Sequence, residues 1–183
     1  GCTFEIGPSS FYQTNPEQTE VLYQLALDAA DLESGMSVLD AYCGTGTIGI
    51  CAAAANSGVE VTGVERVASA VRCAERNARA NGVAERCDFV AADATEWMSR
   101  KAGERHFDVV LMDPPRAGST PEFLHGVADL APERVVYVSC NVQTQARDLE
   151  VLLGRGYTLR SVTPVDMFPH TKHVESVAVL ARR

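Results

Sequence analysis

Short runs of apolar residues alternate along this chain with longer stretches in which apolar residues recur every three or four positions. The short runs are typical of buried β-strands, and the longer stretches are typical of amphipathic helices. Strands that alternate with helices predict an α/β fold, with a parallel sheet covered by helices on both faces. The predicted strands are residues 37–41, 59–65, 87–91, 107–112, 134–139, 158–165 and 174–181.

Local signals mark the ends of several helices. Asn15 stands directly before Pro16, which predicts a helix that begins at Pro16 and is capped by the Asn15 side chain. Gly82 is a typical residue for ending the helix that precedes it. Further helices are expected over residues 47–56 and 68–81 and from Val142 onward.

An acidic residue or a cysteine follows, or closes, most of the predicted strands. In an open α/β sheet the ligand crevice lies beyond the carboxyl ends of the parallel strands. We therefore expect these side chains to meet at one edge of the sheet. They are Asp40, Glu65, Asp93, Asp113 and Cys140.

The composition narrows the class of protein. The 183 residues suit one domain, expected over 1–183, and 46% hydrophobic with 22% charged residues is ordinary for a globular protein. The sequence has no run of about 18 apolar residues, so no membrane-spanning helix is expected. The formal net charge of −8 argues against a large phosphate-binding surface. A nucleic-acid substrate would therefore need affinity from elsewhere.

The cysteines are scattered over predicted helices and strands. None forms a Cys-x-x-Cys pair, so no zinc or iron–sulfur site is expected within this segment. The scatter is typical of reduced thiols in a cytoplasmic protein. The six residues are Cys2, Cys43, Cys51, Cys73, Cys87 and Cys140.

A glycine turn at residues 40–47 predicts a cofactor site. Glycines let a ligand approach the backbone closely. Glu65 closes the next strand about 20 residues further on, where dinucleotide folds place the acid that binds ribose hydroxyls. The turn lacks the complete Gly-x-Gly-x-x-Gly pattern, and Asp40 within it suits an ammonium better than a diphosphate. S-adenosylmethionine therefore fits best, with Asp40, Glu65 and Asp93 as candidate partners.

Two later segments carry a candidate nucleophile and base. The acidic Pro-Pro turn at 113–115 forms a stiff loop, because each proline fixes φ and removes a backbone donor. Cys140 follows a strand, and the helix expected from Val142 offers its positive end, which would favour a thiolate. Glu175 begins the last strand. Each also has an ordinary explanation, as a strand-ending turn, a packed cysteine and a solvated glutamate.

These groups together suit methylation at carbon 5 of a uracil. Carbon 5 is a poor nucleophile until a thiolate adds to carbon 6 and turns the ring into an enolate. The enolate takes the methyl group, a base removes the carbon-5 proton, and the thiolate leaves. We expect Cys140 to be the nucleophile and Glu175 the base.

The chain resembles the catalytic domain of the S-adenosylmethionine-dependent RNA uracil-5-methyltransferases, which make 5-methyluridine in transfer and ribosomal RNA. The matching motifs extend over nearly the whole chain, and the later ones are long and specific. They are residues 11–16, residues 40–46, residues 113–118 with 136–141 and Thr144, and residues 165–175.

The resemblance implies a Rossmann-like class I methyltransferase fold, with an open, mostly parallel seven-stranded sheet and an antiparallel last strand. It implies Cys140 as the nucleophile, Glu175 as the base and Asp113 beside the uracil. Thr47 stands where many members carry Asn, and Val142 replaces a common proline. The S-adenosylmethionine pocket would be lined by Gln13, Tyr42, Thr47, Glu65, Asp93 and Asp113.

The resemblance also bears on domain organisation and partners. Residues 1–15 would be the tail of a preceding β-rich domain, and the chain is expected to open within a strand. An N-terminal RNA-binding barrel that is common in the family is expected to lie outside this chain, and RNA affinity is expected to come largely from that barrel. The expected substrate is ribosomal or transfer RNA, with 23S ribosomal RNA slightly favoured, and the enzyme is expected to be a cytoplasmic monomer.

Two other functions stay open at this point. A methyltransferase acting on an exocyclic amine of adenine or guanine would also use the acidic Pro-Pro turn, but it would leave Cys140 and Glu175 without a task. A catalytically silent module that binds RNA or the cofactor would not need either residue. Loss of methyl transfer on replacing Cys140 separates these functions from uracil chemistry.

Overall fold

A computed structural model describes residues 1–7, 13–101 and 104–183. Within these residues the strands form one seven-stranded sheet in the order β3-β2-β1-β4-β5-β7-β6. Strand β7 runs in the opposite direction to the other six, which confirms the predicted fold class. The strands are β1 Ser37–Ala41, β2 Glu60–Glu65, β3 Cys87–Ala91, β4 Val109–Met112, β5 Arg134–Ser139, β6 Tyr157–Val165 and β7 Glu175–Arg182.

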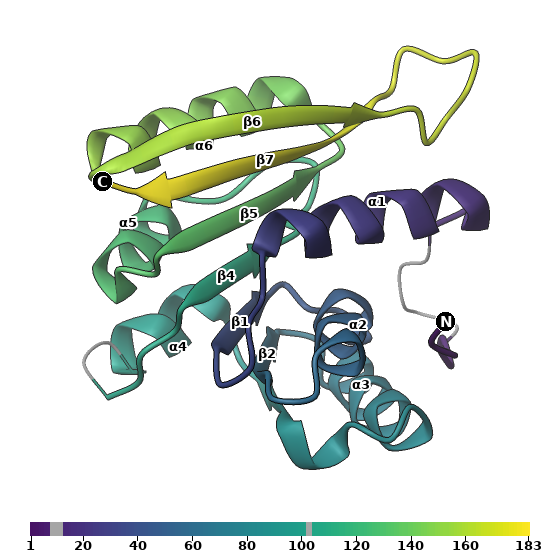
Figure 1. Cartoon of the computed structure of the whole chain (residues 1–183). Helices are drawn as coiled ribbons and strands as arrows, with labels where there is room; N and C mark the ends of the chain where they lie inside the picture. Colours follow the sequence, from purple (N-terminus) through teal and green to yellow (C-terminus); the bar gives the residue numbers. More distant parts are fainter. Residues whose placement is uncertain (8–12, 102–103) are drawn as a thin grey trace.

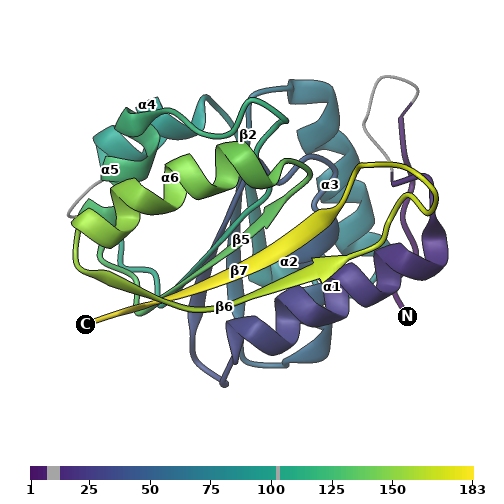
Figure 2. The same ribbon diagram turned by 90° about the horizontal axis from the view of Figure 1, so that it is seen from above.

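Helices cover both faces of the sheet, as Figures 1 and 2 show: α1, α2 and α3 lie on one face and α4, α5 and α6 on the other. Each layer packs on its own apolar cluster, so the central strands are buried from both sides. This explains why β4 is apolar throughout and why the interior of β5, residues 135–138, is also apolar. The helices are α1 Pro16–Ala30, α2 Thr47–Ala55, α3 Ala68–Ala80, α4 Ala94–Lys101, α5 Pro121–Leu130 and α6 Val142–Gly154, with a short 3-10 helix at Ala84–Arg86.

Side chains cap the helices whose starts the sequence marked. The Asn15 side chain accepts a hydrogen bond from the Gln18 N–H at 3.2 Å, as predicted. Thr120 caps α5 in the same way, through a bond from the Phe123 N–H. Helices α4 and α5 were not among those predicted from the sequence. Thr120 before Pro121 nevertheless marks the start of α5 in the same way as Asn15 before Pro16 marks the start of α1.

The first seven residues contain no strand, so the expectation of an opening strand is wrong. No strand of the described sheet pairs with them. Their backbone bonds instead to two side-chain amides of the α3 region, Asn77 and Asn81. No helix among the described residues is long and apolar enough to cross a membrane.

Candidate active site

The predicted convergence at one edge of the sheet is present. Asp40, Glu65, Asp113 and Cys140 lie at the carboxyl ends of β1, β2, β4 and β5. The antiparallel β7 adds Glu175 to this edge, because its amino end lies there. Ser139 pairs with Ser176, which places Cys140 and Glu175 next to each other at the open end of the β5–β7 pair.

The glycine turn follows β1 and is held by the acid at the end of β2. Gly44 and Gly46 have φ of 55° and 80°, and Tyr42 also has a positive φ of 63°. One Glu65 carboxylate oxygen accepts from the Gly44 N–H at 3.2 Å, and the other accepts from the Val67 N–H at 2.8 Å. Glu65 thus lies against the turn, where a ribose-binding acid was predicted.

The Asp40 side chain points into the protein interior and does not face the space where a ligand would bind at this turn. The residue is 2% exposed, and its carboxylate accepts from the Gly49 N–H of α2 at 2.9 Å. Burial raises the pKa of Asp40 to about 7, while the Gly49 bond opposes the rise. The predicted contact of Asp40 with the cofactor ammonium is therefore not supported.

The other predicted cofactor residues have the following surroundings. Gln13 is buried, and its Oε1 has no hydrogen-bond partner within the described structure. An orphaned buried acceptor is costly, so it fits a donor supplied by a ligand. Thr47 begins α2, with its hydroxyl 3.1 Å from the Tyr23 hydroxyl, and the exposed Asp93 caps α4. The ring of Tyr42 packs on Phe123, with centroids 4.8 Å apart.

These observations fit S-adenosylmethionine. A left-handed glycine turn, a carboxylate beside it and an unsatisfied buried amide oxygen match a ligand that carries amino, hydroxyl and adenine donors. Phe11 and Tyr12, which belong to the first matching motif, lie outside the described residues.

Cys140 opens into a cleft of about 460 Å³ beside the sheet edge. The residue is half-buried, whereas Glu175 is only 3% exposed. Cations supplied by the Asp113 loop and the β6–β7 connection border the cleft, and the Arg116 guanidinium lies 3.3 Å from His173 Nδ1. The lining residues are Arg116, Cys140, Asn141, Val142, Gln143, Lys172, His173 and Val174.

A larger hollow of about 550 Å³ lies at the opposite edge, near the starts of β1 and β2. None of the predicted site residues lines it. The cleft at Cys140 is therefore the one that combines space with chemistry.

The acids beside Cys140 hold protons tightly. Burial raises the pKa of the Cys140 thiol, and the charges of Glu175 and Asp113 add to this, while Arg116 opposes it. The expectation that the free protein favours a thiolate is therefore wrong. Burial raises the pKa of Glu175 as well. A carboxylate with a raised pKa is a stronger base, which suits removal of a proton from carbon.

Asp113 gives a pH-dependent prediction. Burial, with Glu175 and Asp40 adding to it, raises the Asp113 pKa from 3.8 to about 8. The folded protein therefore binds the Asp113 proton more tightly than the unfolded chain does. The stability that this proton contributes is lost as the pH rises from 3.8, the ordinary pKa, to about 8, the pKa in the folded protein. Relative to Asp113→Asn, the unfolding free energy of the wild type should fall by about 2 kcal/mol between about pH 5.5 and about pH 7.5. Urea unfolding checks this, and a pH-independent difference would contradict it.

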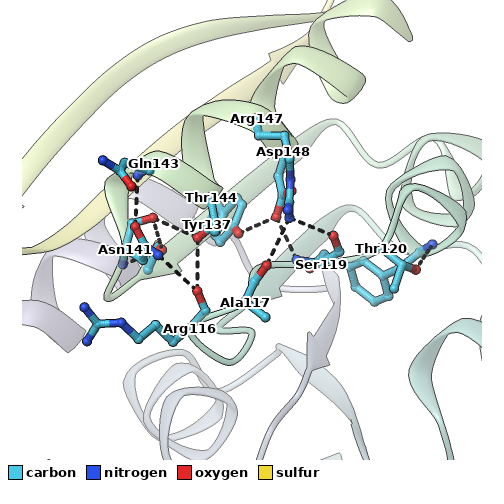
Figure 3. A network of polar contacts seen from close by, with 12 residues as sticks. Arg116, Ala117, Ser119, Thr120, Tyr137, Asn141, Gln143, Thr144, Arg147 and Asp148 are labelled. Atoms are coloured by element: carbon cyan, nitrogen blue, oxygen red, sulfur yellow. Dashed lines mark hydrogen bonds and ion pairs between the residues drawn. The ribbon is translucent and has the colours of Figure 1, made fainter.

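A polar clamp joins the loop after Asp113 to the helix after Cys140 (Figure 3). The Arg116 carbonyl accepts from Asn141 Nδ2 at 3.2 Å and from the Thr144 hydroxyl at 3.3 Å. The Arg147 guanidinium donates to the Ala117 and Ser119 carbonyls at 3.1 and 3.2 Å. Both site loops are therefore fixed relative to each other.

Asp148 is the buried centre of this clamp. It is 1% exposed and accepts from the Ser119 N–H and the Tyr137 hydroxyl, each at 2.7 Å, and it pairs with Arg147. A Cβ on Gly118 would lie 2.6 Å from its carboxylate, which explains the glycine there. Asp148 is not among the predicted site residues. Its place on the buried face of α6 is a local signal of a buried polar network, but its partners lie far away along the chain.

Comparisons with known proteins agree with this geometry. The family model described as tRNA (Uracil-5-)-methyltransferase matches residues 2–183. An uncharacterized RNA methyltransferase of Halalkalibacterium halodurans is 49% identical over 181 residues, which cover 97% of this chain and 38% of the relative. A second uncharacterized RNA methyltransferase, from Lactobacillus johnsonii, is 45% identical, with 98% of this chain and 40% of the relative covered. The chain thus spans about two fifths of the length of these relatives.

Two solved structures share the fold of this chain. A Pyrococcus abyssi tRNA (uracil-54, C5)-methyltransferase in complex with S-adenosyl-L-homocysteine has a TM-score of 0.81 and 36% identity, covering 98% of this chain and 42% of that one. A precorrin-6y C5,15-methyltransferase of Geobacter metallireducens has a TM-score of 0.77 at 16% identity over 98% of this chain and 93% of that one, a likeness of fold alone.

The Pyrococcus abyssi enzyme was solved with S-adenosyl-L-homocysteine, which agrees with the predicted cofactor, S-adenosylmethionine. Together, the family match over nearly all residues, the shared fold and the assembled edge residues give one conclusion. The chain belongs to the tRNA (uracil-5-)-methyltransferase family and has the class I methyltransferase fold.

Proposed function

We propose that this domain transfers a methyl group from S-adenosylmethionine to carbon 5 of a uridine in RNA, through a covalent bond between Cys140 and carbon 6. The observation that carries the proposal is the placement of Cys140 beside Glu175 by the β5–β7 register. Exocyclic-amine chemistry has no use for a thiol beside a base. A silent binding module has no use for either.

The cofactor side of the site is assigned to residues near the glycine turn. Bound S-adenosylmethionine would supply an electrophilic methyl group. Glu65 suits the ribose hydroxyls, because its carboxylate lies against the Gly44 N–H. Gln13 offers a buried acceptor that lacks a partner in the described protein. Tyr42, Thr47, Asp93 and Asp113 complete the proposed pocket.

The substrate side is assigned to the cleft at Cys140. The Cys140 thiol releases its proton to solvent, and its sulfur adds to carbon 6 of the uracil. This gives carbon 5 the electron density to take the methyl group, with S-adenosylhomocysteine as the leaving group. Glu175 then takes the carbon-5 proton, and the bond between sulfur and carbon 6 breaks as the ring double bond returns. Asp113, with a pKa of about 8, carries a proton near neutral pH and suits a bond to a uracil carbonyl.

The substrate is proposed to be ribosomal or transfer RNA, with a 23S ribosomal RNA uridine as the first to test. The net charge of −8 leaves few cations for the RNA backbone. Arg116 and Lys172 at the cleft are suited to local contacts only. We therefore propose that most RNA affinity comes from parts of the protein outside this domain.

Release of tritium tests the proposed function. The protein is mixed with S-adenosylmethionine and RNA that carries tritium at carbon 5 of uridine. Methylation at carbon 5 should release one tritium for each methyl group transferred. Methyl transfer without tritium release would refute carbon-5 chemistry and favour an exocyclic amine. Digestion of the RNA and mass analysis of its nucleosides would then identify the modified base.

A further inference from the structure

One buried amide of α3 contacts both the glycine turn and the amino-terminal segment, defined as residues 1–7. Asn77 is 1% exposed. Its Nδ2 donates to the Thr45 carbonyl and to the Glu5 carbonyl, each at 3.1 Å, and its Oδ1 accepts from the Glu5 N–H at 2.7 Å. A single side chain thus joins two segments that lie far apart in sequence.

A second amide repeats half of this arrangement one helical turn later. Asn81 Oδ1 accepts from the Thr3 N–H at 2.9 Å, and its Nδ2 donates to the Thr3 carbonyl at 2.8 Å. Four helical residues span about 6 Å and two extended residues about 6.6 Å, so Asn77 and Asn81 match alternate residues of the segment. Asn81 contacts the segment but not the glycine turn, which makes it a matched control.

The bond to Thr45 fixes the glycine turn. Thr45 lies between Gly44 and Gly46 and is 5% exposed, so water cannot readily replace a lost donor to its carbonyl. The turn also touches α3 through Gly46, where a Cβ would lie 3.0 Å from the Ala74 Cβ. Helix α3 therefore holds the turn by close packing and by the Asn77 hydrogen bond.

We propose that Asn77 is a positioning residue for the cofactor: it fixes the glycine turn through the Thr45 carbonyl and couples that turn to the amino-terminal segment. The inference rests on the proposed placement of S-adenosylmethionine at this turn. Asn77 itself acts on the ligand only through the backbone of the turn.

Calorimetric binding of S-adenosylhomocysteine to the full chain tests this role. Asn77→Ala should weaken binding about tenfold, which corresponds to about 1.4 kcal/mol. Asn77→Asp keeps the side-chain size and the acceptor for Glu5 but loses both donated bonds, so it should weaken binding to a similar extent. Asn81→Ala should change the affinity less than about twofold, because its bonds reach only the segment. In turnover, Asn77→Ala should raise KM for S-adenosylmethionine and leave kcat at saturation unchanged.

The outcomes separate this inference from the cofactor placement. Equal weakening by Asn77→Ala and Asn81→Ala would assign the effect to docking of the segment and overturn the role of Asn77. Unchanged affinity in both Asn77 variants, with binding lost in Gly46→Val, would overturn the inference alone. Binding that survives Gly46→Val would overturn the placement of the cofactor at the turn, and the inference with it.

Discussion

Replacing Cys140 with alanine should abolish methyl transfer while leaving the affinity for S-adenosylhomocysteine unchanged. The rate should fall about 10⁴-fold or more, because without sulfur addition carbon 5 of uracil is too weak a nucleophile. Cys140 lines the cleft beyond β5, whereas the glycine turn follows β1, so the substitution leaves the proposed cofactor contacts intact. Methyl incorporation into RNA and calorimetric binding measure the two effects separately.

Cys87 provides a matched control. It is also a half-buried cysteine. It begins β3, so it lies at the amino ends of the parallel strands, whereas the candidate site lies at their carboxyl ends. Cys87→Ala should retain nearly full activity. Turnover of Cys140→Ala at the rate of Cys87→Ala would exclude the covalent mechanism.

Glu175→Gln should accumulate a covalent adduct between Cys140 and methylated RNA. Glutamine has almost the same shape but cannot accept the carbon-5 proton, so the reaction should stop after methyl transfer. Removal of a general base lowers rates by about 10²- to 10⁴-fold, and turnover should fall within this range. Denaturing gel electrophoresis with labelled RNA would detect the adduct as a slower band.

Folding should not obscure this result. Glu175 is 3% exposed and burial raises its pKa, so a neutral amide removes a charge that the site disfavours. Glu60→Gln, at the exposed start of β2, controls for the loss of a carboxylate elsewhere. Release of product by Glu175→Gln at the rate of this control would rule out Glu175 as the base.

Much of the fold follows from local sequence patterns. The bounds of β1 and β5 are predicted to the residue, because each strand is short, buried over nearly its whole length and closed by polar residues. Helix α4 has no comparable run, and its amphipathic face becomes clear only when Trp97 and Met98 pack on the cluster beneath α5. The opening segment failed as a strand because its partners are side chains of α3, which no local pattern indicates.

The residues of the site could be predicted from the strand ends, but the distances between their side chains could not. Residues that follow parallel strands must meet at one edge, and this rule found Glu65, Asp113 and Cys140. The nearness of Glu175 depends on the register of an antiparallel strand 35 positions along the chain from Cys140. The raised pKa of Cys140 comes first from burial and then from the charges of Glu175 and Asp113, which are distant in sequence. Asp148 and Asn77 act through long-range bonds and were missed for the same reason.

The most direct test of uracil-5 chemistry is the intact mass of the protein after reaction with S-adenosylmethionine and RNA that contains 5-fluorouridine. After methyl transfer carbon 5 carries fluorine in place of the proton that Glu175 would remove, so the adduct cannot break down. We expect a mass equal to protein plus methylated RNA, absent in Cys140→Ala. An unchanged protein mass, under conditions in which the same protein methylates the unfluorinated RNA, would contradict it.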